Sequence, residues 1–270
     1  PHTYEAVATG KVDSKFGTAI ETGQAKEMVA YTLSLPTIEL EGFHCHVGSQ
    51  VFGEDVYERT SDIMLEFIRE CRARFHVPLP VLDLGGGYGV RYVDRDGEVD
   101  IPAAISRVAR HMQQACARLD MAMPQVHMEP GRSIVADAGL TLYTVGTVKK
   151  ITGYKNYVSV DGGMTDNPRY ALYGSAYTVL LADRPEAKPD LRCDVVGRCC
   201  ESGDIVQPDV DLPEPRRGEI LAVCTTGAYN YSMASNYNRL PRPATVMLTE
   251  DRAYVAVRRE SLEDLVRNDI

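Results

Sequence analysis

Three consecutive glycines follow a short apolar run and could place backbone N–H groups around an anion. The run is VLDLGGGYG (81–89), and its glycines are Gly85, Gly86 and Gly87. Because glycine has no Cβ atom, the backbone can approach a phosphate group closely at such a turn. An ordinary tight turn would use the same residues. The motif by itself leaves both interpretations open.

The motif EPGR (129–132) brings a carboxylate and a guanidinium together at the end of another apolar run. Glu129 could hold a proton on a heterocyclic nitrogen of a cofactor. The N–H of Gly131 and the side chain of Arg132 could bind a phosphate or a carboxylate. An ion pair at the rim of a site would need no ligand, so this simpler interpretation remains as well.

Two histidines, His44 and His46, alternate in the segment GFHCHVGSQ (42–50). On a strand both side chains would face the same side, and such a pair can bind a metal ion in a hydrolase. Only His127 lies on another expected strand, which falls short of a convincing ligand set, so we predict no metal site. His46 alone could instead stack its flat ring on a cofactor, and His44 could be a buried, hydrogen-bonded side chain.

Two loop-like segments of the second half carry groups suited to an amino-acid substrate. DGGMTDNPRYALYG (161–174) contains Arg169 and Tyr173, which could clamp a carboxylate by charge and hydroxyl. CCESGD (199–204) places a thiol that could donate a proton next to Glu201, which could meet an ammonium group. Both segments could also be plain connections between strands.

The elements that must position these residues alternate between helix and strand in the first half of the chain. Apolar residues recur at helical spacing over 56–71 and 101–119, and more weakly over 24–35. The strands expected beside these helices lie within 38–50, 81–89 and 126–132. This rhythm is typical of a parallel sheet, which binds ligands at the carboxyl ends of its strands.

After about residue 138 the sequence changes to β-branched and Tyr-rich runs, which predict a mostly antiparallel β part. Its one convincing helix is SLEDLVRND (261–269), where Ser261 and Asp264 have capping-box spacing. The parallel half could be an open doubly wound sheet or a (β/α)8 barrel. The barrel is favoured because GGGYG lacks the spacing of the dinucleotide-binding fingerprint.

Composition excludes several classes of protein. The 270 residues carry 29 Lys and Arg against 38 Asp and Glu, a net charge of −9, so we expect no nucleic-acid partner. No apolar run approaches the roughly 18 residues of a membrane span. Seven cysteines without CxxC spacing indicate free thiols in a reducing cytoplasm. Because the chain begins with Pro1 and not Met, we expect an N-terminally truncated fragment.

Taken together and in this order, eight segments resemble the diaminopimelate decarboxylases, which are pyridoxal-phosphate enzymes with an alanine-racemase-like fold. The matching segments are DSKFG, GFHCHVGSQ, LDLGGGYG, MEPGR, VDGGMTDNPR with ALYG, CESGD, GAY and ASNYN. The resemblance implies an α/β plus β protein. Residues 1–138 would form the C-terminal part of a TIM-like (β/α)8 barrel that binds pyridoxal 5'-phosphate, and residues 139–270 would form the β-domain.

The resemblance also implies roles for particular residues. His46 would stack on the pyridine ring, Glu129 would pair with its nitrogen, and Cys200 would return a proton to the substrate after CO2 leaves. The implied cofactor-binding residues are His46, Ser49, Gly86, Gly87, Glu129, Gly131, Arg132 and Tyr229. The implied substrate-binding residues are Arg132, Arg169, Tyr173, Glu201 and Tyr229, with Glu201 on the distal amine. The reaction would convert meso-2,6-diaminopimelate to L-lysine, and Cys200 would serve the partner's active site in a homodimer.

The sequence departs from the family pattern in three places. No lysine lies in the YAVKAN-like context of the family's Schiff-base lysine, so we expect the chain alone to be inactive. Arg198 and Cys199 replace a Pro and an aliphatic residue, and Tyr170 replaces a Pro. Decarboxylation of another basic amino acid and a catalytically silent binding protein therefore remain alternatives.

Overall fold

The computed structural model describes residues 13–53 and 55–270, and the chain divides into two compact units. The first unit comprises the residues up to 90 together with 96–134. The second unit comprises 91–95 and 135–270. Each unit has its own main sheet.

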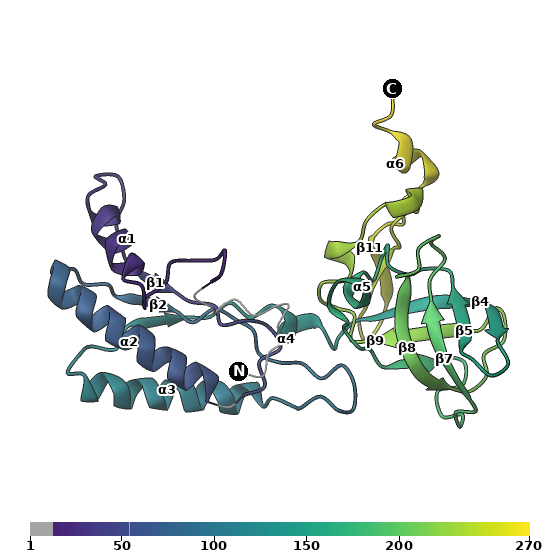
Figure 1. Cartoon of the computed structure of the whole chain (residues 1–270), viewed down its shortest axis with the longest axis horizontal. Helices are drawn as coiled ribbons and strands as arrows, with labels where there is room; N and C mark the ends of the chain where they lie inside the picture. The colour runs from purple at the N-terminus through teal and green to yellow at the C-terminus, as the bar shows by residue number, and fades with distance from the viewer. Residues whose placement is uncertain (1–12, 54) are drawn as a thin grey trace. The chain divides into compact units, whose positions relative to one another are not determined.

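The first unit contains a parallel sheet with the strand order β1-β2-β3. These strands are β1 (Gly42–His44), β2 (Val81–Asp83) and β3 (Gln125–His127). The helices are α1 (Gln24–Leu33), α2 (Val56–Phe75) and α3 (Ile101–Arg118), and α4 (Arg132–Val135) follows β3. Figure 1 shows α2 and α3 side by side along the strands. The helical and parallel pattern expected for this half is confirmed, although the strands are shorter than the apolar runs.

Apolar periodicity and capping explain where the two long helices form. Asp100 caps α3 by accepting the N–H of Ala103 at 3.0 Å, an interaction that contributes on the order of 1 kcal/mol. The C-terminal end of α2 is set by His76, which adopts a left-handed conformation with a φ of 55° and ends the helix. The helices bury their apolar faces in a core with the sheet, which includes Leu65, Ile68, Leu82, Leu84 and Met112.

The second unit is a six-stranded sheet with the order β6-β9-β4-β5-β7-β8. Its strands are β4 (Leu140–Lys150), β5 (Asn156–Val160), β6 (Val179–Leu181), β7 (Leu191–Val196), β8 (Ile205–Leu212) and β9 (Ile220–Cys224). Among these described strands only β5 and β7 pair in parallel, so the sheet is mostly antiparallel as expected. The edge strands β6 and β8 contact each other, which nearly closes the sheet into a barrel.

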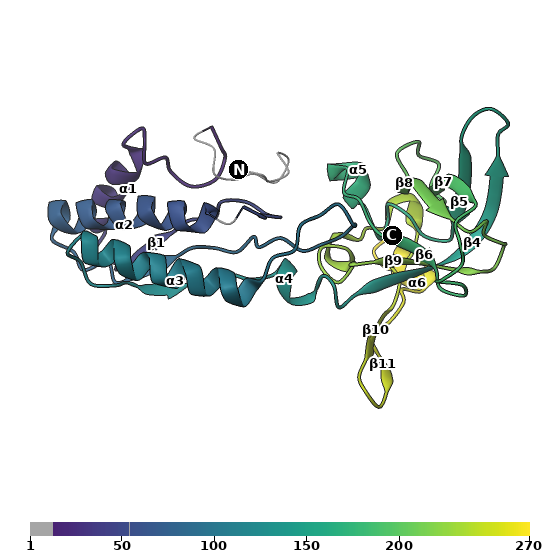
Figure 2. The same cartoon turned by 90° about the horizontal axis from the view of Figure 1, so that it is seen from below.

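Short elements complete the second unit. They are α5 (Arg169–Tyr173), the 3-10 turns η2 (Tyr231–Met233) and η3 (Tyr237–Arg239), β10 (Thr245–Leu248), β11 (Ala253–Val257) and α6 (Leu262–Val266). Figure 2 shows β10 and β11 projecting from the sheet as an antiparallel hairpin. The capping box predicted for Ser261 and Asp264 is confirmed at the start of α6. The turn-rich segment 161–174, in contrast, contains the helix α5 that periodicity did not indicate.

The seven cysteines are free thiols. Among the described residues, no helix is long and apolar enough to cross a membrane.

Candidate active site

The carboxyl ends of the three parallel strands bring polar side chains to one edge of the first unit. Strand register pairs His44 with Asp83, and Asp83 with His127. The loops that leave this edge carry His46, the glycine run and Glu129. The edge where ligands bind in parallel α/β folds is thus the edge that holds the first-unit residues of the predicted site.

Glu129 lies against His44, with 2.9 Å between Oε2 of the carboxylate and Nε2 of the ring. Both side chains are about half exposed, so His44 is hydrogen-bonded but not buried. His44, Asp83 and Glu129 each place a ligand atom within 4.8 Å of the others, a spacing that could admit a cation. β1 ends at His44 and His46 lies beyond the strand, so the two histidines do not alternate along one strand.

His46 joins the loops that follow β1 and β2. Its Nδ1 accepts the backbone N–H of Gly86, with 3.2 Å between the two nitrogens. This contact fixes the orientation of the imidazole ring. It also means that the N–H of Gly86, which we expected to face a phosphate, is directed to a side chain in this structure.

The glycine run allows the three loops to approach one another. A Cβ atom on Gly86 would collide with the carbonyl of Glu129, and one on Gly87 would collide with the carbonyl of Gly48. Gly87 also has a φ of 103°, which residues with a side chain rarely adopt. The glycines therefore serve close backbone packing at the strand ends, and the result is an edge lined by backbone.

Arg132 and Ser49 form a second polar pair in the first unit. The Nη2 and Nε atoms of Arg132 donate to Oγ of Ser49 over 2.9 and 3.3 Å. Arg132 is buried, with only 5% of its surface exposed. A guanidinium and a hydroxyl held together in this way can bind a phosphate or a carboxylate.

In the second unit, Arg169 is a buried cation at the start of α5, with 6% of its surface exposed. Its guanidinium carbon lies 5.5 Å from the ring centroid of Tyr173 and 5.6 Å from that of Tyr229. Nη2 donates to Oγ of Ser175 at 3.3 Å, while Nε has no partner among the described residues. No described carboxylate pairs with Arg169. A buried charge without a counter-ion is costly, so this position favours an anionic ligand.

Further buried polar groups surround α5. Asn167, Tyr177 and Asn230 have buried polar side-chain atoms, and Tyr177 lies close to Asn230 and Arg169. Burial raises the pKa of Tyr177 to about 12, an effect that the charge of Arg169 partly offsets. These side chains keep the surroundings of Arg169 polar.

Cys200 and Glu201 lie at an exposed turn of the second unit. The backbone N–H of Gly203 donates to Oε1 of Glu201 at 3.3 Å. The hydroxyl of Tyr237 donates to Oε2 of Glu201 at 3.5 Å. The negative charge of Glu201 raises the pKa of Tyr237, and the two thiols Cys199 and Cys200 act in the same direction. Tyr237 therefore lies near Cys200, the predicted proton donor, and Glu201, the predicted ligand of the distal amine.

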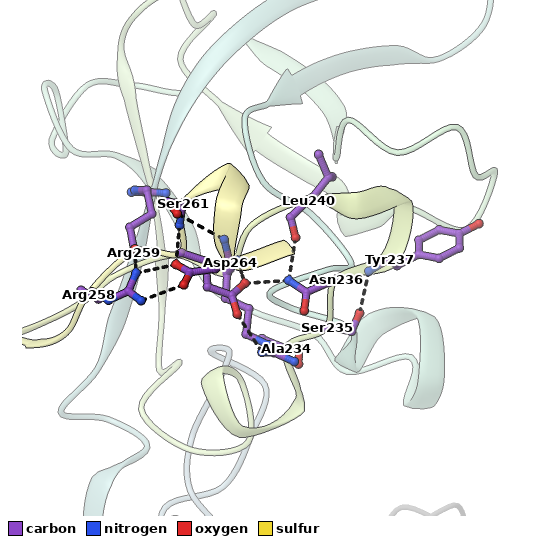
Figure 3. Close-up of polar contacts among 11 residues, drawn as sticks. Ala234, Ser235, Asn236, Tyr237, Leu240, Arg258, Arg259, Ser261 and Asp264 are labelled. Carbon is purple, nitrogen blue, oxygen red and sulfur yellow. Dashed lines mark hydrogen bonds and ion pairs between the residues drawn. The ribbon is translucent and has the colours of Figure 1, made fainter. Parts of the chain in front are cut away.

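A polar network holds the segment that carries Tyr237 (Figure 3). Nδ2 of Asn236 donates to the carbonyl of Leu240 at 3.0 Å and to Oε2 of Glu260 at 2.6 Å. The backbone N–H and Nη1 of Arg242 also donate to the Glu260 carboxylate, at 2.8 and 3.0 Å. Glu260 thus connects Asn236 and Arg242, which flank η3 on its two sides. The segment ASNYN resembles the family pattern, but its sequence indicates no role for Tyr237, because a contact between residues 36 positions apart leaves no periodic signal.

The predicted residues fall into three local groups. His46 with Gly86, and Ser49 with Arg132, meet in the first unit. Arg169, Tyr173 and Tyr229 meet in the second. Glu201, adjacent to Cys200, contacts Tyr237 at a further position in the second unit.

Comparisons with known proteins agree on one family. Residues 1–136 match the pyridoxal-binding domain of the pyridoxal-dependent decarboxylases. The diaminopimelate decarboxylase of Bacillus subtilis is 41% identical over 269 residues, which cover 100% of this chain and 61% of that protein. That of Actinosynnema pretiosum is 45% identical over 272 residues, with coverages of 100% and 60%.

A solved structure gives the same result. The diaminopimelate decarboxylase of Helicobacter pylori, complexed with L-lysine, superimposes with a TM-score of 0.85 at 33% identity. The match covers 98% of this chain and 63% of that one. The chain therefore spans about three-fifths of the length of the curated relatives it matches.

Proposed function

The chain belongs to the pyridoxal-dependent decarboxylases, and from this membership we propose that the protein decarboxylates meso-2,6-diaminopimelate to L-lysine with pyridoxal 5'-phosphate. The names of its relatives support the substrate. The observation that carries the proposal is Arg169, a buried guanidinium without a carboxylate among the described residues. Diaminopimelate has a second carboxylate at the end remote from the reaction, whereas ornithine and arginine have none.

The first unit offers groups that fit pyridoxal phosphate. Arg132 and Ser49 supply donors for a phosphate, beside an edge where glycines let the loops pack closely. For the phosphate we propose Ser49, Gly87, Gly131, Arg132 and Tyr229. For the ring we propose Glu129 and His46, with Gly86 holding the His46 imidazole through its N–H. When bound, pyridoxal phosphate supplies an electron sink that makes loss of CO2 feasible.

Glu129 and His46 would set the electronic state and the orientation of the cofactor ring. The negative charge of Glu129 favours a proton on the pyridine nitrogen. The His46 imidazole is already oriented by the N–H of Gly86, so it offers a flat surface in a fixed direction. Both side chains thus act by being held in place before the substrate arrives.

The second unit would bind the remote end of the substrate and move a proton. Arg169 and Tyr173 would hold the distal carboxylate, with Arg132 as a further ligand, and Glu201 would accept the distal ammonium group. The Cys200 thiol would donate a proton to the α-carbon that lost CO2. We also propose, from the family resemblance, that Cys200 serves the active site of a partner subunit. The seven free thiols support a cytoplasmic location.

The 270 residues alone are proposed to be inactive. The lysine that attaches the cofactor in this family has no counterpart in a YAVKAN-like context here. The described part of the first unit also has three parallel strands, whereas a closed barrel of this type has eight. Activity is therefore tested in the intact protein.

The test measures CO2 release by the intact, cofactor-loaded protein from meso-diaminopimelate, L-lysine, L-ornithine and L-arginine. We expect kcat/KM for meso-diaminopimelate to exceed the others by at least about 100-fold, because Arg169 would remain unpaired with them. Preference for ornithine or arginine would replace the proposal by decarboxylation of another basic amino acid. Cofactor absorbance without CO2 release from any of them would favour a silent binding protein.

A further inference from the structure

Asp204 is a buried carboxylate that binds backbone and not a cation. Only 3% of its surface is exposed, and no described Lys or Arg forms an ion pair with it. Its Oδ1 accepts the N–H of Met164 at 2.6 Å, and its Oδ2 accepts the N–H of Cys199 at 2.8 Å. A buried carboxylate is stable only when such donors satisfy it, so both N–H groups are tied to this position.

The backbone of Asp204 also closes the turn that carries Cys200 and Glu201. The N–H of Gly197 donates to the carbonyl of Asp204 at 2.9 Å, and the N–H of Asp204 donates to the carbonyl of Glu201 at 3.0 Å. With the bond from Cys199, three contacts fix the base of the turn. Cys200 and Glu201 remain exposed at its tip.

The same carboxylate connects this turn to the segment that leads into α5. Met164 lies five residues before Arg169 in the loop 161–168, and Arg198 N–H donates to the carbonyl of Gly162 at 3.2 Å. Cβ atoms on Gly163 or Gly197 would collide with the Asp204 carboxylate, so the two loops close tightly around it. One side chain thus sets the spacing between the Cys200 turn and the Arg169 segment.

We propose that Asp204 is a positioning residue that holds Cys200 and Glu201 in register with the segment carrying Arg169. The inference rests on the proposed function, because it assigns these residues to a decarboxylation site. Asp204 itself touches neither substrate nor cofactor in this scheme. It acts through two backbone N–H groups, and a neutral amide cannot replace both of its acceptor oxygens.

Asp204 also affects the pKa of the neighbouring Cys199 thiol. Burial, followed by the negative charge of Asp204, raises the pKa of Cys199 to about 11. Among the other charged neighbours, Arg198 lowers this pKa and Asp166 raises it. Cys199 therefore stays protonated at neutral pH, and its reaction with an alkylating reagent reports whether Asp204 is in place.

The experiment compares Asp204→Asn with the control Asp211→Asn in the intact protein. Asp211 lies in the same strand region but is exposed and pairs with Arg192 at 3.4 Å. We expect Asp204→Asn to lower kcat at least about tenfold and raise KM for diaminopimelate, with unchanged cofactor absorbance, because positioning contributes factors of this order. The control should leave both parameters within about twofold, as a surface change of this kind does.

A second measurement is independent of turnover. In a Cys200→Ser background, iodoacetamide labelling of Cys199 should have a pH midpoint near 11, and Asp204→Asn should move this midpoint toward 9, the ordinary value. At pH 8 the labelling rate should rise at least about tenfold. If kcat and the labelling midpoint both stay unchanged in Asp204→Asn, the positioning role is wrong.

The two ideas can fail separately. If the intact protein releases no CO2 but Asp204→Asn still shifts the midpoint, the decarboxylase proposal fails and the hold of Asp204 on the turn stands. If Asp204→Asn does not fold, amide hydrogen exchange in the unmutated protein decides, because the N–H groups of Met164 and Cys199 must then exchange at least about tenfold more slowly than the N–H of exposed Cys200. Equal rates would overturn the inference.

Discussion

Nε2 of His44 lies 2.9 Å from Oε2 of Glu129, so the end of β1 holds the carboxylate that follows β3. The backbone N–H of Glu129 also donates to the carbonyl of Gly85, at 2.9 Å, in the loop after β2. Contacts from two different strand ends therefore fix Glu129 before any ligand binds. A group that must act on one cofactor atom gains from such preorganisation, since no reorganisation is needed during the reaction.

Replacement of Glu129 by glutamine should preserve cofactor binding and remove most activity in the intact protein. The amide has nearly the same shape, but it carries no charge to hold a proton on the pyridine nitrogen. We expect kcat to fall by about 10² or more, as for other positioned proton-holding groups. Glu70→Gln, an exposed change on α2, is the control. Activity within about threefold of the unmutated protein, a barrier change below about 1 kcal/mol, would remove this role.

Replacement of Arg169 by methionine should weaken substrate use without weakening the fold. Loss of one partner of a buried charge pair costs about 2 to 5 kcal/mol, so kcat/KM for diaminopimelate should drop at least about 30-fold. Because the ligand-free protein loses an unpaired buried charge, its midpoint of thermal unfolding should not fall. Arg192→Met, on an exposed arginine, is the matched control. Unchanged kcat/KM would place the distal carboxylate elsewhere.

The sequence predicted elements well where a period repeats. The apolar spacing of 56–71 and 101–119 indicated α2 and α3, and the capping-box spacing indicated α6, because these signals depend on neighbours three or four residues apart. The pattern did not indicate α5, since its five residues hold too few turns for a period to appear. It also overestimated the strands, because His46 and Gly86 continue apolar runs but belong to loops.

In the candidate site, too, local motifs were predicted and contacts between distant residues were not. Motif order and resemblance predicted Glu129, Arg132 and Arg169, because a carboxylate or a guanidinium in these motifs indicates which groups it can bind. Nothing local in the sequence predicted that His44 contacts Glu129, 85 residues away, or that Asp204 accepts the N–H of Met164. Such contacts depend on how strand ends and loops close, which is a property of the tertiary fold.

Replacement of Tyr237 by phenylalanine should affect substrate binding more than turnover. The Tyr237 hydroxyl donates to Glu201 at 3.5 Å, a long and exposed contact, so its loss should be small. We expect KM for diaminopimelate to rise about two- to fivefold, in the lower part of the roughly 0.5 to 1.5 kcal/mol of one hydrogen bond, with kcat nearly constant. Tyr254→Phe in the β11 strand is the control. A selective fall in kcat would instead assign Tyr237 to the proton transfer.

Asp166 should make stability depend on pH. Burial raises its pKa above the ordinary value of 3.8, although hydrogen bonds from Tyr143, Gly163 and Thr165 oppose the shift. The folded state therefore binds this proton more tightly than the unfolded state, and its contribution is full below pH 3.8 and is lost as the pH rises through the raised pKa. Urea unfolding from pH 4 to 6.5 should show the unmutated protein losing stability relative to Asp166→Asn. A constant difference would contradict the raised pKa.

Cys200 tests chemistry and assembly together. If its thiol donates the proton after CO2 loss, Cys200→Ala should slow turnover by about 10² to 10⁴-fold while cofactor absorbance stays, because that is the usual contribution of a positioned acid. If Cys200 also serves the partner subunit, a mixed dimer of Cys200→Ala with Glu129→Gln contains one site with both groups intact. Random exchange of subunits should then restore about one quarter of the unmutated activity. Retained activity in Cys200→Ala would show that the Cys200 thiol does not donate the proton. Verified exchange of subunits without rescue would place Cys200 in the site of its own subunit.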